Sequence, residues 1–277
     1  MFGTRRCRDG WITLAGSKSR TIDIIDGLRL WRIWLKWSWS DVRQRYSRSV
    51  IGPFWATIGL AVTVVGIGGV FSLLWNIETR SLIPHIATGL ILWTFISQVV
   101  NEGTSVFASN AQIIKSVKLP MSLHAYRLIS KNFIVAAHHL LIYVAVILIY
   151  DLPIGHLTLL AIPGLLLYAL NAGWIVLFLG VICTRYRDIP QVVQNLTMLL
   201  FFISPVFWFS ETLGEGRVQL IVKFNILAHF LDLVRLPMLG KAPAMGTWIV
   251  VIVFTLVGWA ITLPFFERYR KRTPNWL

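Results

Sequence analysis

Six polar side chains recur along one apolar stretch, residues 86–107, and they are the groups in this sequence best placed to do chemistry. They are Thr94, Ser97, Gln98, Asn101, Glu102 and Ser105. Successive members are three, one, three, one and three residues apart, so all six lie on one face of an α-helix. Because polar groups that face lipid are costly, this face must meet other helices or an aqueous path. Hydrogen bonding between helices is the simpler interpretation, and a route for a polar cargo is the functional one.

Groups suited to acid–base or metal chemistry are sparse. Asp151 and His156 lie near the boundary of one apolar stretch, and His138 and His139 lie within another. Adjacent residues of a helix point about 100° apart, so the two histidines cannot form a compact two-ligand site by themselves. The sequence contains no G-x-x-x-x-G-K-[ST] phosphate-binding loop. We therefore predict no catalytic, cofactor-binding or metal site, and a membrane-embedded acyl- or glycosyltransferase is a less favoured alternative.

Six apolar stretches must position these groups. They run roughly over residues 54–75, 86–107, 133–150, 157–182, 191–209 and 248–266. Each is about long enough to cross the ~30 Å hydrocarbon core of a bilayer as a helix, the conformation in which a lipid-embedded segment satisfies its own backbone. Only 14% of the residues are charged, whereas about a quarter would be charged in a soluble domain. The sequence predicts an all-α integral membrane protein with six transmembrane helices.

The distribution of positive charge predicts the topology. Of 26 Lys and Arg residues, 21 lie before the first stretch, between the second and third, between the fourth and fifth, and after the sixth. The positive-inside rule therefore puts both termini and these two connections in the cytoplasm. The net charge of +14 then reflects topology and attraction to anionic lipid rather than binding of nucleic acid. Cys7 and Cys183 match no metal or redox spacing and are predicted to be free thiols on the cytoplasmic side.

The chain divides into three parts. Residues 1–21 are expected to form a mobile basic tail, and residues 51–277 the six-span domain. Between them, residues 22–50 carry apolar side chains at helical spacing with basic residues between them. This pattern predicts an amphipathic helix in the cytoplasmic interface, which is either a simple anchor or a lever that moves with the first span.

Two connections carry helix-start signals. Asn110 can cap a short helix that runs to about Leu119, and Pro120 can start the longer helix of the third span. That short helix is a natural docking element for a soluble partner, and a loop lying on the lipid headgroups is the alternative. Further on, Asp188 fits an N-cap, with Pro190 in the first turn and Gln191 as the reciprocal capping partner. Arg187 and Asp188 could also form a charge pair that holds the cytoplasmic end of the bundle.

The outer side is expected to be aromatic and partly inserted. Residues 201–209 contain five aromatic side chains around Pro205, which should break or kink the helix. They form either an aromatic belt at the membrane interface or a surface for stacking on sugar rings. Residues 210–247 are predicted to form a helical hairpin, with helices at 218–224 and 227–239 that are broken around Asn225 and at Pro237.

Four segments in this order resemble the membrane subunit of type-2 ATP-binding-cassette (ABC) exporters, specifically the polysaccharide-export permeases. They are residues 45–55 (RYSRSVIGPFW), 114–120 (IKSVKLP), 185–189 (RYRDI) and 204–208 (SPVFW). The resemblance covers nearly the whole chain from about residue 28. One departure lies in the outer hairpin, where relatives often have Asn-Pro and this sequence has Asn225 followed by Ile226.

The resemblance implies a homodimer with two copies of a separate ABC ATPase subunit, which would bind ATP and Mg²⁺. It implies a lipid-linked polysaccharide as cargo (O-antigen-like, capsular or teichoic acid) and a location in the cytoplasmic (inner) membrane of a bacterium. A type-2 permease for small lipids or drugs remains an alternative. A passive anchor or scaffold would explain the spans but not the polar face of residues 94–105.

The resemblance also suggests roles for individual residues. Coupling to the ATPase is expected at Asn110, Ile113, Ile114, Lys115, Lys118 and Pro120. A cytoplasmic gate or interface is expected at Arg45, Tyr46, Gly52, Pro53, Arg187 and Asp188. The translocation path is expected to include Trp93, Gln98, Asn101, Glu102, Trp174, Phe178, Phe202 and Trp208.

Overall fold

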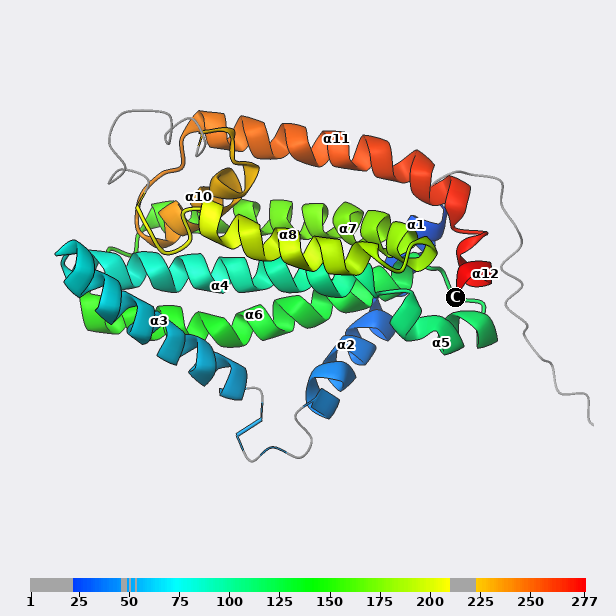
Figure 1. Ribbon diagram of the computed structural model, residues 1–277, viewed down its shortest axis with the longest axis horizontal. Helices are drawn as coiled ribbons and strands as arrows, with labels where there is room; N and C mark the ends of the chain where they lie inside the picture. Colours follow the sequence, from blue (N-terminus) through cyan, green and yellow to red (C-terminus); the bar gives the residue numbers. More distant parts are fainter. Residues whose placement is uncertain (1–21, 46–48, 50, 53, 210–222) are drawn as a thin grey trace, which may run out of the picture.

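The computed structural model describes residues 22–45, 49, 51, 52, 54–209 and 223–277, which form an elongated bundle of helices with no strand among them (Figure 1). The helices before the middle of the chain are α1 (Ile22–Arg29), α2 (Trp31–Arg45), α3 (Phe54–Trp75), α4 (Thr79–Thr104), the 3₁₀ turn η1 (Ala108–Asn110), α5 (Ala111–Ser116) and α6 (Ser122–Tyr150). The others are η2 (His156–Leu160), α7 (Ala161–Arg185), α8 (Ile189–Ile203), α10 (Ile226–Met238), α11 (Met245–Tyr269) and α12 (Thr273–Trp276).

Five helical segments are long and apolar enough to cross a membrane. They are α3, α4, α6, α7 together with η2, and α11. The all-α prediction and five of its six spans therefore match helices of the right length and composition. The remaining expected span, the fifth (residues 191–209), instead contains α8, whose 15 residues extend only about 22 Å. The helix stops at Ile203 because the next residues are Ser204 and Pro205, and proline cannot continue the hydrogen-bond ladder.

Helix α4 lies at the centre of the bundle, between α6 on one side and α7 and α8 on the other (Figure 1). Of its most apolar 18-residue window, 67% of the residues are buried, against 17% for α3. Small residues let neighbours approach closely. A Cβ atom on Gly89 would lie only 2.2 Å from the Val206 carbonyl oxygen, and one on Gly103 would lie 3.3 Å from Val176. The side chains of α4 are therefore held against fixed partners.

The amphipathic segment forms two helices, α1 and α2, rather than one, with a break at Leu30. Asp23 on α1 accepts hydrogen bonds from the backbone N–H groups of Met121 and Ser122, at 3.2 and 3.0 Å, so it caps the start of α6 from a distant part of the chain. Farther along, Ser38 on α2 donates to the Arg127 carbonyl oxygen at 2.8 Å. The segment is thus attached to α6 along its length.

The expected helix of residues 110–119 is shorter than predicted, because α5 ends at Ser116. The prediction that the Asn110 side chain caps it is wrong. The side-chain N–H₂ of Asn110 donates to the Val106 carbonyl oxygen, at 2.8 Å, and its Oδ1 accepts from Arg127. The amide is therefore not available to the first turn of α5. Helix α6 begins at Ser122, two residues beyond Pro120.

The start of α8 is also simpler than predicted. Pro190 lies in its first turn as expected, but Asp188 makes no side-chain capping hydrogen bond. Gln191 donates instead to Asn195 Oδ1, one turn later, at 3.3 Å. Arg187 and Asp188 are both exposed, and the structure gives no ion pair between them. The capping box and the charge pair expected here are therefore both absent.

The predicted helix of residues 227–239 is present as α10, which begins at Ile226, just after the predicted break around Asn225; the Asn225 Oδ1 caps it by accepting from the Leu227 N–H at 2.9 Å. Pro237 does not break this helix but lies in its last turn. Most of the first predicted hairpin helix, residues 218–224, lies outside the described residues. The buried Arg235 donates to the Pro205 carbonyl oxygen at 2.6 Å, which attaches α10 to the turn that follows α8.

Candidate functional site

A groove of about 560 Å³ runs between α4 and α8. The two helices lie side by side and antiparallel (Figure 1). The lining residues are Trp93, Ser97 and Asn101 from α4, and Gln191, Gln194, Asn195, Thr197, Met198, Phe201 and Phe202 from α8. On α4 they recur every four residues, and on α8 mostly every three or four, so one face of each helix forms each wall.

The chemistry of the groove changes along its length. One end is aromatic, with the Trp93 and Phe201 ring centroids 5.5 Å apart and Phe202 5.3 Å from Phe201. The other end, towards the start of α8, carries the side-chain amides of Asn101, Gln191, Gln194 and Asn195. Since four amides facing lipid would be costly, this end of the groove is suited to water, a polar ligand or another subunit.

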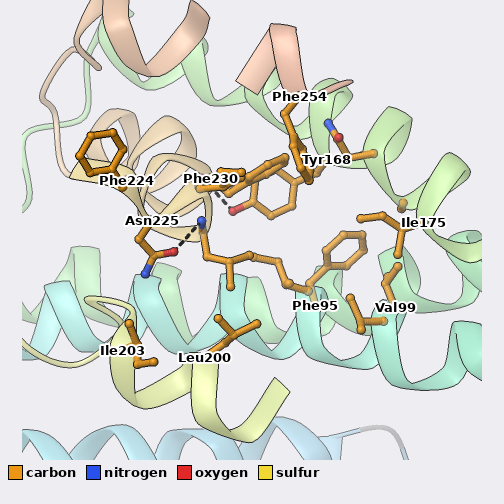
Figure 2. Close-up of a pocket in the computed structure, with 16 residues that line it drawn as sticks. Phe95, Val99, Tyr168, Ile175, Leu200, Ile203, Phe224, Asn225, Phe230 and Phe254 are labelled. Carbon is orange, nitrogen blue, oxygen red and sulfur yellow. Dashed lines mark hydrogen bonds between the residues drawn. The ribbon is translucent and has the colours of Figure 1, made fainter. Parts of the chain in front are cut away.

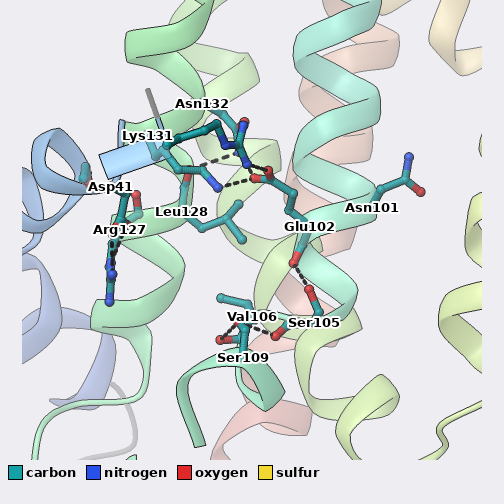
Figure 3. A network of polar contacts seen from close by, with 12 residues as sticks. Asp41, Asn101, Glu102, Ser105, Val106, Ser109, Arg127, Leu128, Lys131 and Asn132 are labelled. Carbon is teal, nitrogen blue, oxygen red and sulfur yellow. Dashed lines mark hydrogen bonds and ion pairs between the residues drawn. The ribbon is translucent and has the colours of Figure 1, made fainter. Parts of the chain in front are cut away.

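Asn101 is the most informative group in the groove. Its Oδ1 is buried and has no hydrogen-bond partner in the structure. Figure 3 shows its side chain pointing away from that of Glu102, the next residue on α4. Nearby, the Ser97 hydroxyl donates to the Thr94 carbonyl oxygen at 3.1 Å, which leaves the oxygen of Ser97 free to accept. An unpaired buried acceptor is costly, and because Asn101 lines the groove, rotation of its amide toward the groove would let a ligand donate a hydrogen bond to this oxygen.

Glu102 belongs to a separate network of charges on the opposite side of α4 (Figure 3). Its Oε2 lies 2.7 Å from Lys131 Nζ and accepts from Asn132 Nδ2 at 3.0 Å. Its Oε1 lies 3.1 Å from Arg45 Nη2. The carboxylate thus joins α2, α4 and α6, and its charge is fully matched within the protein.

Arg127 on α6 is a second junction in this region. It donates two hydrogen bonds to the Asp41 carboxylate on α2, at 2.5 and 2.6 Å, and a third to Asn110 Oδ1 at 3.1 Å. Its guanidinium also lies 5.1 Å from the ring centroid of Trp37. A planar guanidinium can hold several partners in fixed directions. Arg127 therefore links α2 to the residue immediately before α5.

The α5 segment presents two kinds of side chain. Ile114 packs against the core of the bundle, and Ile113 is half-buried. Lys115 and Lys118 are exposed. The short C-terminal helix α12 packs beside α5. A short helix that is anchored on one side, with one exposed lysine in its last turn and another two residues beyond its end, is suited to contact with a soluble protein at this end of the bundle.

Comparison with known proteins identifies the family. Residues 34–239 match the family described as ABC-2 type transporter. This chain belongs to the ABC-2 type transporter family. The match covers the groove, the charged network and α5. The resemblance inferred from four short sequence segments is confirmed at this level.

Three relatives of this ABC-2 transporter chain are described as O-antigen export system permease protein RfbA. Two are from Klebsiella pneumoniae, one 24% identical over 69% of this chain and 74% of the relative, the other 23% identical over 80% and 87%. The third is from Myxococcus xanthus and is 22% identical over 67% of this chain and 72% of the relative. Family membership and several apolar helices make this chain a multi-pass membrane protein.

The residues predicted for the path of this ABC-2 chain fall into separate places. Trp93, Asn101 and Phe202 meet in the groove, and Trp208 is close by, since its Nε1 donates to the Phe202 carbonyl oxygen at 3.3 Å. Glu102 instead faces the charged network. Gln98, one turn before Glu102, is half-buried and does not line the groove. The single polar face predicted for residues 94–105 is thus divided between two sites.

Trp174 and Phe178 are not brought to the groove. Trp174 packs so closely on α11 that a Cβ atom on Gly258 would lie 2.3 Å from its ring, and its Nε1 donates to Asn171 Oδ1 at 2.8 Å. Phe178 packs against Phe265 of α11, with ring centroids 5.1 Å apart. Both aromatic residues therefore contribute to packing between α7 and α11.

Of the residues predicted for the cytoplasmic gate or interface, the structure gives contacts for some and does not describe others. Arg45 joins the charged network through Glu102. Gly52 has a φ angle of 63°, which few other residues adopt without strain. Tyr46 and Pro53 lie outside the described residues. Cys183 is buried, with 5% of its surface exposed, and Cys7 lies outside the described residues.

Several residues of both sites were not anticipated from the sequence. In the groove they are Gln194 and Asn195, and in the charged network Asp41, Arg127, Lys131 and Asn132. A signal for the groove was present, because Gln191, Gln194 and Asn195 recur at helical spacing in an apolar stretch. The network carried no local signal, because its members come from segments up to 86 residues apart.

A second cavity, of about 600 Å³, lies between α4, α7, α8 and α10 and is almost wholly apolar (Figure 2). Its polar groups are satisfied by the protein. The Tyr168 hydroxyl donates to the Phe230 carbonyl oxygen at 2.9 Å, and Asn225 caps α10. This cavity offers nothing for a sugar to bind and is suited to a hydrocarbon chain.

Two of the histidines singled out in the sequence, His138 and His139, make contacts within the bundle. His139 Nδ1 lies 3.4 Å from Thr57 Oγ1 on α3, and His138 Nδ1 lies 2.7 Å from the Ile134 carbonyl oxygen. Within the ranges that the structure describes, no three His, Cys, Asp or Glu side chains gather in a way that could hold a metal ion.

Proposed function

We propose that this chain is the permease subunit of an ATP-driven exporter that moves a lipid-linked polysaccharide from the cytoplasmic to the outer side of the cytoplasmic membrane of a bacterium. In this proposal two copies of the chain form a homodimer with both termini in the cytoplasm. Two copies of a separate ABC ATPase, which bind ATP and Mg²⁺, supply the energy. The cargo is O-antigen-like, capsular or teichoic acid.

The groove between α4 and α8 carries this proposal. It combines aromatic rings with side-chain amides in a membrane-spanning bundle, and these are groups that contact sugar rings and sugar hydroxyls. Stacking on aromatic rings suits a moving polymer, because it tolerates changes of register better than fixed hydrogen bonds do. The names of the three relatives, all O-antigen export permeases, support the same cargo class.

The opposite side of α4 supports a role for the cytoplasmic end in coupling. A soluble ATPase that contacts Lys115 and Lys118 would move α5. Arg127 and Asn110 would then pass the movement to α2, and Glu102 would pass it to α4, on which the groove is built. Each link in this series is a charged or hydrogen-bonded contact.

Charge reversal tests the coupling. The double variant Lys115→Glu, Lys118→Glu, co-expressed with the ATPase, should insert into the membrane and leave ATP hydrolysis running while surface polysaccharide is lost. Export is measured by immunoblot of the glycan on intact cells that lack the chromosomal copy. Lys241→Glu, an exposed lysine at the other end of the bundle, serves as the matched control. Unchanged export in the double variant would show that residues 108–120 do not couple ATP hydrolysis to transport.

A second candidate function, a type-2 permease for small lipids or drugs, is favoured by the apolar cavity in Figure 2. The two candidates differ in which site transport depends on. Leu200→Trp would fill the apolar cavity, and Asn101→Ala would change the groove. Loss of transport with the first variant and not the second would favour the small-lipid permease.

A further inference from the structure

We propose that the groove between α4 and α8 selects uncharged sugar polymers and excludes anionic ones. This inference rests on the proposed export of a polysaccharide and narrows its cargo. Of the three cargo types named above, it favours an O-antigen-like chain of neutral sugars over teichoic acid or an acidic capsule.

The first argument is the absence of charge. None of the ten described side chains that line the groove is ionisable. Composition does not explain this, because the chain contains 26 Lys and Arg residues, and several lie at the same end of the bundle. The charges nearest along α4 and α6, Glu102 and Lys131, neutralise one another on the opposite side of α4. A carboxylate or phosphate in the groove would be partly desolvated with no cationic side chain among the lining residues.

The second argument comes from hydrogen bonding. A sugar hydroxyl both donates and accepts, so it can satisfy either end of a side-chain amide. An ionised carboxylate or phosphodiester only accepts, so it can use the N–H₂ end alone. Asn101 lines the groove and its Oδ1 is buried without a partner, so rotation of this amide toward the groove would let a sugar hydroxyl donate to the oxygen, whereas an anion would be repelled by it.

The third argument concerns the aromatic end. The face of an aromatic ring carries partial negative charge, which attracts the C–H faces of a neutral sugar and disfavours an anion. Phe202 is 56% exposed and offers such a surface, while Trp93 is buried in contact with Phe201. Both ends of the groove therefore favour the same class of polymer.

Equilibrium dialysis tests the selectivity. The permease–ATPase complex in nanodiscs is mixed with one of two end-labelled decasaccharides, a neutral oligomannose or an anionic oligogalacturonate. The neutral probe should bind at least about tenfold more tightly, since the anion lacks a cation partner. Equal or tighter binding of the oligogalacturonate would overturn the inference and leave polysaccharide export itself intact.

A charge introduced into the groove gives the second arm of the test. Gln194→Lys should increase oligogalacturonate affinity about tenfold, because it supplies the missing cation, and should not increase oligomannose affinity, because it removes one neutral amide from the groove. The same substitution at Gln44, on α2 and outside the groove, is the control and should change neither. If Gln194→Lys leaves the oligogalacturonate affinity unchanged, the groove is not where the glycan binds. Binding of neither probe to the unmodified complex would contradict the proposed selectivity of the groove. The immunoblot of surface glycan tests the export proposal separately.

Discussion

Asn101 and Glu102 are consecutive residues of α4, yet they belong to opposite kinds of site. Asn101 is neutral, faces the groove shared with α8, and has an oxygen without a partner. Glu102 is charged, faces α6 and α2, and has three partners. The rotation of about 100° between adjacent helical residues is enough to separate them.

The difference teaches where this protein can accept a ligand. A partly buried carboxylate must be paired to be stable, so the charged side of α4 is saturated and holds helices together. A neutral amide can be left partly unsatisfied at a smaller cost. The uncharged side of α4, which faces α8, is therefore the side that can accept a ligand. The charged side, which faces α2 and α6, holds the helices together.

Glu102→Gln should have the largest effect on stability. It leaves Lys131, whose side chain is 16% exposed, and Arg45 without their carboxylate. Loss of a buried charge partner predicts a destabilisation of about 2–4 kcal/mol. The melting temperature of the purified protein in detergent measures this loss. Glu102→Gln, Lys131→Met should recover part of it, because the double variant removes both charges.

Arg127→Lys should have the next largest effect. Lysine keeps the positive charge but cannot hold Asp41 and Asn110 together, so a loss of about 1–2 kcal/mol is expected. Hydrogen–deuterium exchange should rise over residues 31–45, because α2 loses its two-point ion pair with α6. Arg187→Lys, at an exposed arginine without an ion pair in the structure, is the control. Equal exchange in both variants would contradict the role given to Arg127.

Asn101→Ala should separate function from stability. Because Oδ1 has no partner, its removal should leave the melting temperature unchanged or slightly raised. Export of the surface glycan should fall about three- to tenfold, in line with the loss of a hydrogen bond to the cargo. A fall in melting temperature as large as that of Glu102→Gln would contradict the assignment of Asn101 to ligand binding and of Glu102 to stability.

The smallest effect is expected from a labelling variant. Cys183 was a natural probe of topology, but its burial makes it a poor one. Val117, just after α5, is 49% exposed. In a cysteine-free background, Val117→Cys should leave export unchanged and react with a membrane-impermeant thiol reagent only after lysis. Labelling on intact cells would put α5 and the charged network on the outer side.

Local patterns predicted much of the fold. The apolar stretches predicted five of the long helices, the break expected around Asn225 lies just before α10, and Pro190 lies in the first turn of α8 as predicted. Side-chain capping was predicted less well. Asn110 and Asp188 both stand before a helix, but Asn110 bonds to Arg127 and Val106, and Asp188 makes no capping bond. A capping residue is recognised by its neighbours in sequence, while its actual partner can come from anywhere in the fold.

The sequence by itself determined that the chain is helical, apolar and basic at one side, because hydrophobic length and charge distribution act locally along the chain. It also marked residues 94–105 as a polar face. Only the tertiary structure decided that this face is divided, with Asn101 turned to α8 and Glu102 to α6. The physical reason is that the partners of Glu102 lie 57 residues earlier and 30 residues later in the chain. Long-range packing, rather than helical periodicity, assigns one residue to a ligand groove and its neighbour to a structural ion network.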